Sequence, residues 1–312
     1  MLKKIKNVYK QNGVKGLFFS GTAKILSLSG KALLNTGDLV GLAAGNYRFF
    51  LTQAERDLLK RNKIFKDKHK GKRCFIIGNG PSLKTQDMSP LAHEITFVMS
   101  AFWKHPAIEK WQPTYYCFVD PLFFDHSETL KEFFQSLNLR IHDATFFVPL
   151  DAAGIIRQQD LLPLDKTYYA GFHHTAGKDS IQSINLVKRL PYVMGVSQLA
   201  IMVAMYMGCS PIYLLGHDHN WLSHRGLEQH FYEGNAGLEK HPEFFPTLNH
   251  WSYKYLMECQ LKLWRIYEKL SVFSHGKGIQ IFNATDGGFL DLFERVSYEA
   301  MIKKKLASRE LL

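Results

Sequence analysis

Short apolar runs that alternate with helical patterns constrain the fold of this 312-residue chain more than any other feature. The clearest run is 72–78, KRCFIIG, which opens on a Gly-Asn-Gly-Pro-Ser turn and is typical of a buried first strand. Strands separated by helices indicate an α/β protein with a doubly wound, mostly parallel sheet. The other predicted strands are 94–100, 115–119, 144–148, 211–216 and 278–283, and the predicted helices are 127–136, 197–207 and 253–270.

Glycines and short polar residues follow several of the predicted strands. In doubly wound sheets, ligands bind beyond the carboxyl ends of the strands. We therefore expect a ligand site at one edge of the sheet. The residues that this rule gathers there are Gly78 to Ser82, Ser100, Asp120, Gly216 to His219 and Asn283 to Asp286.

The sharpest local motif is 78–83, GNGPSL. The glycines Gly78 and Gly80 let the backbone pass close to a ligand, and Asn79 offers a donor and an acceptor to a base or ribose. Ser82 could cap the next helix, whose free N–H groups would suit a phosphate. The motif is neither a P-loop nor a full GxGxxG, and a structural tight turn is the alternative.

A second motif, Gly195-Val196-Ser197, opens the apolar helix predicted at 197–207. A glycine and a hydroxyl at a buried helix N-terminus can receive a phosphate. Simple capping of the helix by Ser197 is the alternative.

A third motif follows the strand 211–216 and reads Gly216-His217-Asp218-His219-Asn220. Asp218 is placed to bind a ribose hydroxyl or to orient a histidine. His217 and His219 alternate along the chain and should point to opposite faces, which argues against a shared metal site. The chain contains no Asp-x-Asp pair, the usual magnesium or manganese clamp of many sugar-nucleotide transferases, so we expect no metal.

The loop before the last predicted helix carries Asn249-His250. A loop histidine can act as a general base near neutral pH, and His250 is our candidate for that role. The alternative is a surface or capping residue.

These motifs together resemble the bacterial sialyltransferases of the Campylobacter type. The similarity is carried, in order and spacing, by 78–83 (GNGPSL), 119–124 (VDPLFF) and 208–218 (GCSPIYLLGHD). The chain also resembles the wider group of motility-associated-factor glycosyltransferases and MptE-like 6-hydroxymethylpterin pyrophosphokinases, to which 283–288 (NATDGG) is similar. The resemblance spans about residues 71–300.

The resemblance implies a Rossmann-like glycosyltransferase that uses a CMP-sugar without a metal or other cofactor. It implies nucleotide contacts from Asn79 to Ser82, Gly195 and Asp218, with Ser100 near the position of a family asparagine. His250 best matches the catalytic histidine. In the transferase mechanism that we expect, His219, Tyr232 or a helix N-terminus would stabilise the leaving phosphate. The full set of candidate residues is His250, His219 and Asp218 for catalysis, and Gly78, Asn79, Gly80, Pro81, Ser82, Ser100, Asp120, Gly195, Ser197, Gly216 and Asn283 for the nucleotide.

Positive charge is concentrated at the N-terminus. Residues 1–70 hold 15 Lys or Arg and 4 Asp or Glu, whereas the rest of the chain holds 24 of each. A neutral body argues against a nucleic-acid partner, and four cysteines without a CxxC pair favour a reducing cytoplasm. We therefore predict a basic, partly amphipathic helical extension, 1–70, and a nucleotide-sugar-binding catalytic domain, 71–312.

The extension contains no uninterrupted apolar stretch of the roughly 18–20 residues that a spanning helix needs, and no Ala-x-Ala-like cleavage site. Apolar residues among lysines suit helices that lie on an anionic membrane surface. The alternatives for residues 1–50 are a basic face packed on the body and a partner-binding arm.

The leading hypothesis is a bacterial glycosyltransferase that moves a sugar from a nucleotide-sugar to a surface-glycan or glycolipid acceptor in polysaccharide biosynthesis. We expect it in the cytoplasm, with peripheral contact at the inner face of the membrane through residues 1–50. One alternative is an MptE-like diphosphokinase that uses ATP, magnesium and a pterin. Another is a non-catalytic nucleotide-binding scaffold.

Overall fold

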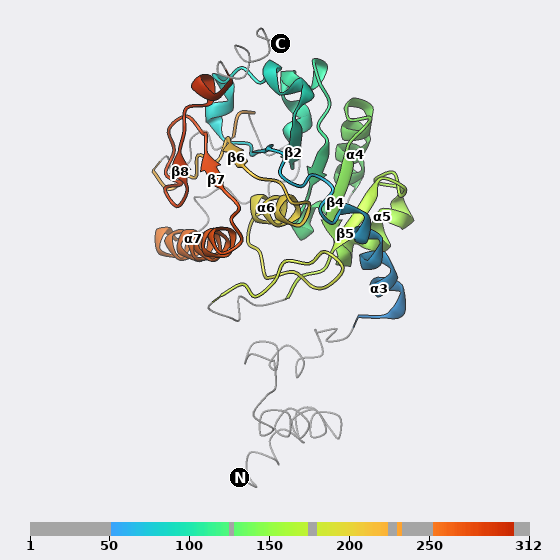
Figure 1. The fold of residues 1–312 in the computed structure, drawn as a ribbon. Coiled ribbons are helices and arrows are strands. Elements are labelled where there is room, and N and C mark those ends of the chain that lie inside the picture. The colour runs from blue at the N-terminus through green and yellow to red at the C-terminus, as the bar shows by residue number, and fades with distance from the viewer. Residues whose placement is uncertain (1–50, 125–127, 174–179, 224–229, 233–251, 303–312) are drawn as a thin grey trace, which may run out of the picture.

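The computed structural model describes residues 51–124, 128–173, 180–223, 230–232 and 252–302 (Figure 1). These residues form one sheet in the order β5-β4-β3-β2-β1-β6-β7-β8, in which every pair of neighbouring strands is parallel. The predicted α/β, doubly wound fold is therefore confirmed. The strands are β1 Cys74–Ile77, β2 Ile95–Met99, β3 Tyr115–Cys117, β4 Thr145–Pro149, β5 Thr167–Ala170, β6 Ile212–Leu215, β7 Ile281–Asn283 and β8 Glu294–Arg295.

Helices cover both faces of the sheet, and each face has its own apolar core (Figure 1). Alternate residues of β1 show the division: Phe75 and Ile77 pack with α4 and α5, whereas Cys74 and Ile76 pack with α6 and α7. The helices are α3 Gln53–Lys60, α4 Glu128–Arg140, α5 Ala153–Gln159, α6 Val196–Tyr206 and α7 Tyr253–His275. Short 3-10 helices lie at Arg61–Phe65, Pro81–Lys84, Ser89–His93, Phe102–Lys104, Pro106–Glu109, Pro121–Phe124 and Leu150–Ala152.

The order of the strands reverses between β1 and β6. Strands β1 to β5 succeed one another in one direction, and the chain then returns to place β6 on the other side of β1. Helix α6 lies in the connection that leads to β6, and it packs against β1, β2 and β3. Nearly all of its residues are buried, which agrees with its apolar sequence. The carboxyl ends of β1 and β6 therefore meet at a topological switch point.

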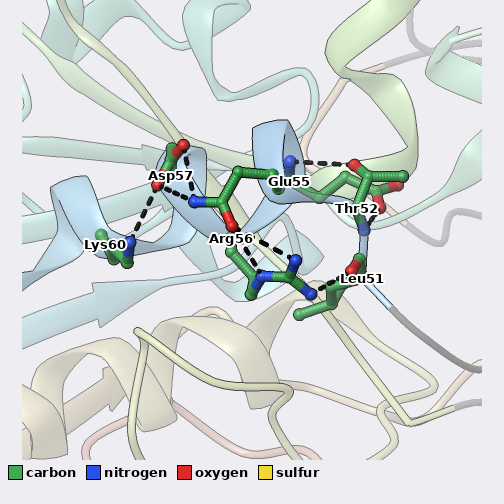
Figure 2. Close-up of polar contacts among 7 residues, drawn as sticks. Leu51, Thr52, Glu55, Arg56, Asp57 and Lys60 are labelled. Carbon is green, nitrogen blue, oxygen red and sulfur yellow. Dashed lines mark hydrogen bonds and ion pairs between the residues drawn. The ribbon is translucent and has the colours of Figure 1, made fainter.

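The first described residues begin with a tightly capped helix (Figure 2). The Thr52 hydroxyl accepts a hydrogen bond from the Glu55 N–H at 3.2 Å, and the Glu55 carboxylate accepts one from the Thr52 N–H at 2.7 Å. The Arg56 guanidinium also donates to the Leu51 carbonyl. This capping box fixes the point at which the chain enters α3.

Residues 51–70, which we predicted to belong to the extension, pack into the domain. Leu59 and Phe65 are buried, one in each core. The buried Asn62 side chain donates to the carbonyls of Tyr169 at 2.7 Å and Leu186 at 2.8 Å. The domain therefore begins before the predicted boundary at residue 71.

Among the described residues, no helix is both long and apolar enough to span a bilayer.

Candidate functional site

A cavity of about 870 Å³ lies where the carboxyl ends of β1 to β5 meet the N-terminus of α6. Its position follows the rule for doubly wound sheets, and its size is in the range of small-molecule sites. Of the predicted site residues, it brings together Asn79, Ser100, Asp120 and Gly195. Its wall also includes Leu51, Glu55, Val119, Phe123, Asp151, Phe172, His173, Arg189, Tyr192, Val196, His230 and Tyr232.

The loop after β1 packs directly on the loop after β6. The N–H of Gly78 donates to the Leu215 carbonyl at 2.7 Å, and the N–H of Gly80 donates to the Gly216 carbonyl at 2.9 Å. A Cβ on Gly80 would lie 1.7 Å from a carboxylate oxygen of Asp218. These glycines are therefore explained by the approach of two protein loops to each other.

Asp218 holds the two loops together. Its carboxylate accepts hydrogen bonds from the Ser82 N–H at 3.1 Å and the Ser82 hydroxyl at 2.8 Å. Its carbonyl accepts one from the Phe289 N–H at 2.7 Å. Burial raises the pKa of Asp218, and the Ser82 hydrogen bonds oppose that shift. Asp218 and Ser82 lie outside the cavity wall, and they shape the loop that carries Asn79.

Asn79 forms part of the cavity wall. Its Nδ2 donates to the Met99 carbonyl at 3.2 Å, which fixes the orientation of the amide. Its Oδ1 is buried and, among the described residues, has no hydrogen-bond partner. A buried acceptor without a partner is costly, so this oxygen suits a donor group of a ligand or an ordered water.

Ser100 and Asp120 follow β2 and β3 at the same edge of the sheet. Ser100 has a φ of 50°, in the left-handed region, and its carbonyl accepts a hydrogen bond from the Tyr116 hydroxyl at 2.7 Å. This buried tyrosine holds the turn that places Ser100 in the wall. A non-glycine residue in this conformation is uncommon and is often found at functional sites.

The N-terminus of α6 opens on the cavity through Gly195 and Val196. Gln198, which the sequence did not single out, shapes this turn: its Oε1 accepts hydrogen bonds from the N–H groups of Met194 at 2.8 Å and Gly195 at 3.2 Å. Ser197 is buried, and its hydroxyl contacts the Met99 sulfur at 3.4 Å rather than lining the wall. A glutamine three residues into a helix is the signal that reveals this cap.

His217 and His219 do not point to opposite faces as predicted. Strand β6 ends at Leu215, Gly216 has a φ of 65°, and the two rings lie with their centroids 6.2 Å apart. Burial lowers the pKa of His217 to about 4 and that of His219 to about 3, so both rings are neutral. His219 Nε2 lies 3.2 Å from the Tyr267 hydroxyl of α7.

The remaining predicted residues serve other contacts or lie elsewhere. Asn283 is buried, and its Nδ2 donates to the Leu290 carbonyl at 2.7 Å while its Oδ1 accepts from the Thr285 N–H at 3.0 Å. His250 lies outside the described residues. Within the described part of the chain, no group of three or more His, Cys, Asp or Glu residues is arranged to hold a metal ion.

His230 and Tyr232 complete the wall beside Asn79. Their rings are stacked, with centroids 4.8 Å apart and an interplanar angle of 19°. Burial lowers the pKa of His230, and a hydrogen bond to the Asn79 backbone opposes that shift. A neutral histidine in a cavity wall can accept a proton, so His230 is a base candidate that the sequence did not single out for that role.

No protein-family model matches this chain, and no curated protein sequence matches it. Solved structures of similar fold include the MAf glycosyltransferase from Magnetospirillum magneticum AMB-1, at 13% identity and a TM-score of 0.44. That match covers 88% of this chain but only 45% of the MAf protein. The sialyltransferase CstII from Campylobacter jejuni, solved with CMP-3FNeuAc, matches at 17% identity and a TM-score of 0.42, over 72% of this chain and 86% of its own.

Both structures come from groups that the sequence motifs resemble. A structure of the same sialyltransferase with a trisaccharide acceptor and CMP matches at the same values. The assignment of the site rests on the residues of this chain alone.

Proposed function

We propose that this chain is a glycosyltransferase that takes a sugar from a nucleotide-sugar, such as a CMP-sugar, and passes it to a glycan or glycolipid acceptor. The observation that carries the proposal is the pairing of two features in one cavity. One is the Asn79 side chain, whose Oδ1 has no hydrogen-bond partner among the described residues, and the other is the N-terminus of α6 at Gly195. The first suits an amino or hydroxyl donor of a nucleoside, and the second suits a phosphate.

The reaction needs a general base for the acceptor hydroxyl and groups that stabilise the leaving phosphate. The acceptor hydroxyl oxygen attacks the anomeric carbon, the bond from that carbon to the phosphate oxygen breaks, and the acceptor proton passes to a histidine. His250 is the base that the sequence favours, and His230 is the candidate within the described wall. The nucleotide leaves with its phosphate at the N-terminus of α6, whose N–H groups stabilise the negative charge without a metal.

The test is a thermal-shift screen of the full chain against CMP, UDP, GDP and ATP, with and without magnesium, because a ligand that binds only the folded state raises the apparent stability. Hydrolysis of CMP-, UDP- and GDP-sugars is then followed by release of the nucleotide. We expect one of CMP, UDP and GDP to raise the midpoint of thermal unfolding in the absence of magnesium. No binding and no hydrolysis of any of them would exclude the proposal.

Variants separate the two base candidates. His230→Ala and His250→Ala are compared with His142→Ala, which removes an exposed histidine far from the cavity wall. The base variant should lose about 10² to 10⁴-fold in transfer rate while it keeps nucleotide binding. ATP-dependent turnover of a hydroxymethylpterin would instead favour the diphosphokinase alternative.

A further inference from the structure

The cavity is long in one direction. It runs along the strand ends from Asn79 after β1 to Gly171 and Phe172 after β5. Neighbouring strands lie about 4.8 Å apart, so the two ends are separated by roughly 19 Å. A nucleotide bound at Asn79 and the N-terminus of α6 therefore leaves the β4–β5 end for a second group.

The β4–β5 end has a wall of mixed charge. Asp151 follows β4 and is exposed, and Glu55 comes from the first turn of α3. Opposite charge comes from Arg189, whose guanidinium donates to the Phe172 carbonyl at 3.0 Å. Tyr192, which lies between Arg189 and Gly195 in the sequence, adds an aromatic ring to the cavity wall. Among the wall residues that the structure describes, two carboxylates and one guanidinium give this end an excess of negative charge, which disfavours an anionic ligand.

The part of this wall that comes from α3 is held in place. The capping box with Thr52 orients the Glu55 carboxylate (Figure 2), and Leu59 anchors the helix in the core beside β5. A fixed wall loses little entropy when a ligand binds, which is what a positioning site requires.

We propose that the β4–β5 end of the cavity is the acceptor subsite and that it takes a neutral, polyhydroxylated group such as a sugar ring. This inference rests on the proposed function. Hydroxyls donate to the carboxylates of Glu55 and Asp151 and accept from Arg189, which matches the two roles that each hydroxyl can play. The ring of Tyr192 offers an apolar face to the C–H groups of the sugar.

The experiment uses the full chain and saturation-transfer NMR with methyl β-D-galactopyranoside, methyl α-D-glucopyranoside and the anionic methyl β-D-glucuronide. Asp151→Asn and Glu55→Gln are compared with Asp57→Asn, which removes an exposed carboxylate of the same helix that lies outside the wall. Glutamine at position 55 keeps the capping box, so Glu55→Gln should fold. Asp151 is exposed, so its variant gives an independent measurement.

We expect a neutral glycoside to bind, and both wall variants to weaken that binding about tenfold while Asp57→Asn leaves it unchanged. The thermal shift with nucleotide should stay the same in all three variants. The inference is overturned if no glycoside binds, if the glucuronide binds as well as the neutral sugars, or if the wall variants behave like Asp57→Asn. Glycoside binding without binding of any nucleotide would instead exclude the proposed function.

Discussion

Gly80 lacks a side chain because the Asp218 carboxylate occupies the space that a Cβ would need. Gly80→Ala should force the loop after β1 away from Asp218, break the hydrogen bonds to Ser82 and displace Asn79. We expect a loss of about 2–3 kcal/mol in the free energy of unfolding, measured by urea denaturation, together with loss of nucleotide binding.

The matched control is Gly154→Ala. Gly154 lies in helix α5, and an added Cβ there meets open space. Alanine should stabilise that helix by about 0.5–1 kcal/mol. Equal effects of the two substitutions would show that the contact between Gly80 and Asp218 does not constrain the loop.

The lowered pKa of His217 predicts that the free energy of unfolding decreases in acid. Its folded pKa of about 4 lies below the unfolded value near 6.5, so the unfolded state binds more protons between these values. Stability is therefore complete above pH 6.5 and falls as the pH drops towards 4, by about 3 kcal/mol for this residue. Burial lowers the pKa of His219 further, to about 3, and it also lowers the pKa of His69, His105 and His230, so all four add to the same slope.

The measurement is the midpoint of thermal unfolding between pH 7 and pH 4.5. His217→Asn keeps a donor near the position of Nδ1, which contacts the Leu215 carbonyl at 2.9 Å, but it cannot take up a proton. It should reduce the slope of the pH dependence without abolishing it, because His219 and the other buried histidines still contribute. The exposed-site variant His142→Asn should keep the slope of the natural chain. An unchanged slope in His217→Asn would contradict the assignment.

At the scale of the element, Gln198 supports the cavity end of α6. Besides accepting from Met194 and Gly195, its Nε2 donates to the Leu263 carbonyl of α7 at 3.2 Å. Gln198→Ala should remove the partners of these half-buried groups and loosen the turn, at a cost of about 1–3 kcal/mol. We expect a lower thermal midpoint and about tenfold weaker nucleotide binding by calorimetry. Gln182→Ala, at an exposed site, should change neither measurement.

Most helices and strands were predictable from the sequence, whereas the short strands β5 and β8 were not. Strands β1 to β4, β6 and β7, with α4, α6 and α7, lie where the pattern placed them. Strand β5 was missed because its four residues, TYYA, include a half-buried tyrosine and carry little alternation. Strand β8 has two exposed residues, and the Arg295 guanidinium secures it by donating to the Gly287 and Gly288 carbonyls. Such a contact leaves no periodic signal.

The edge of the sheet that holds the site was predictable because the end of each strand can be recognised from the local sequence. The contacts between loops that follow different strands were not predictable. Asp218 and Ser82 are separated by 136 residues, and only the pairing of β1 with β6 brings them together. The sequence therefore suggested a ligand contact for Asp218, where the structure has a contact between two loops.

At the scale of the whole molecule, residues 51–70 pack with the domain, although we predicted them to be part of the extension. Residues 1–50 carry eight Lys or Arg and one Asp, whereas Leu51 and Glu55 already line the cavity. We therefore expect a chain that lacks residues 1–50 to unfold cooperatively and to bind nucleotide like the full chain. A chain that lacks residues 1–60 loses Leu59 from the core, and it should be less stable by about 2–3 kcal/mol or more.

The same truncations test the membrane hypothesis. In sedimentation with vesicles of phosphatidylglycerol and phosphatidylcholine, the full chain should bind at low salt and dissociate as salt screens the basic residues, and the chain without residues 1–50 should stay in solution. Vesicles of phosphatidylcholine alone are the control, because they lack the anionic charge. If the chain without residues 1–60 were as stable as the one without 1–50, α3 would belong to the extension after all. If both truncated chains still bound anionic vesicles, the attachment would lie on the domain, and the basic N-terminus would need another partner.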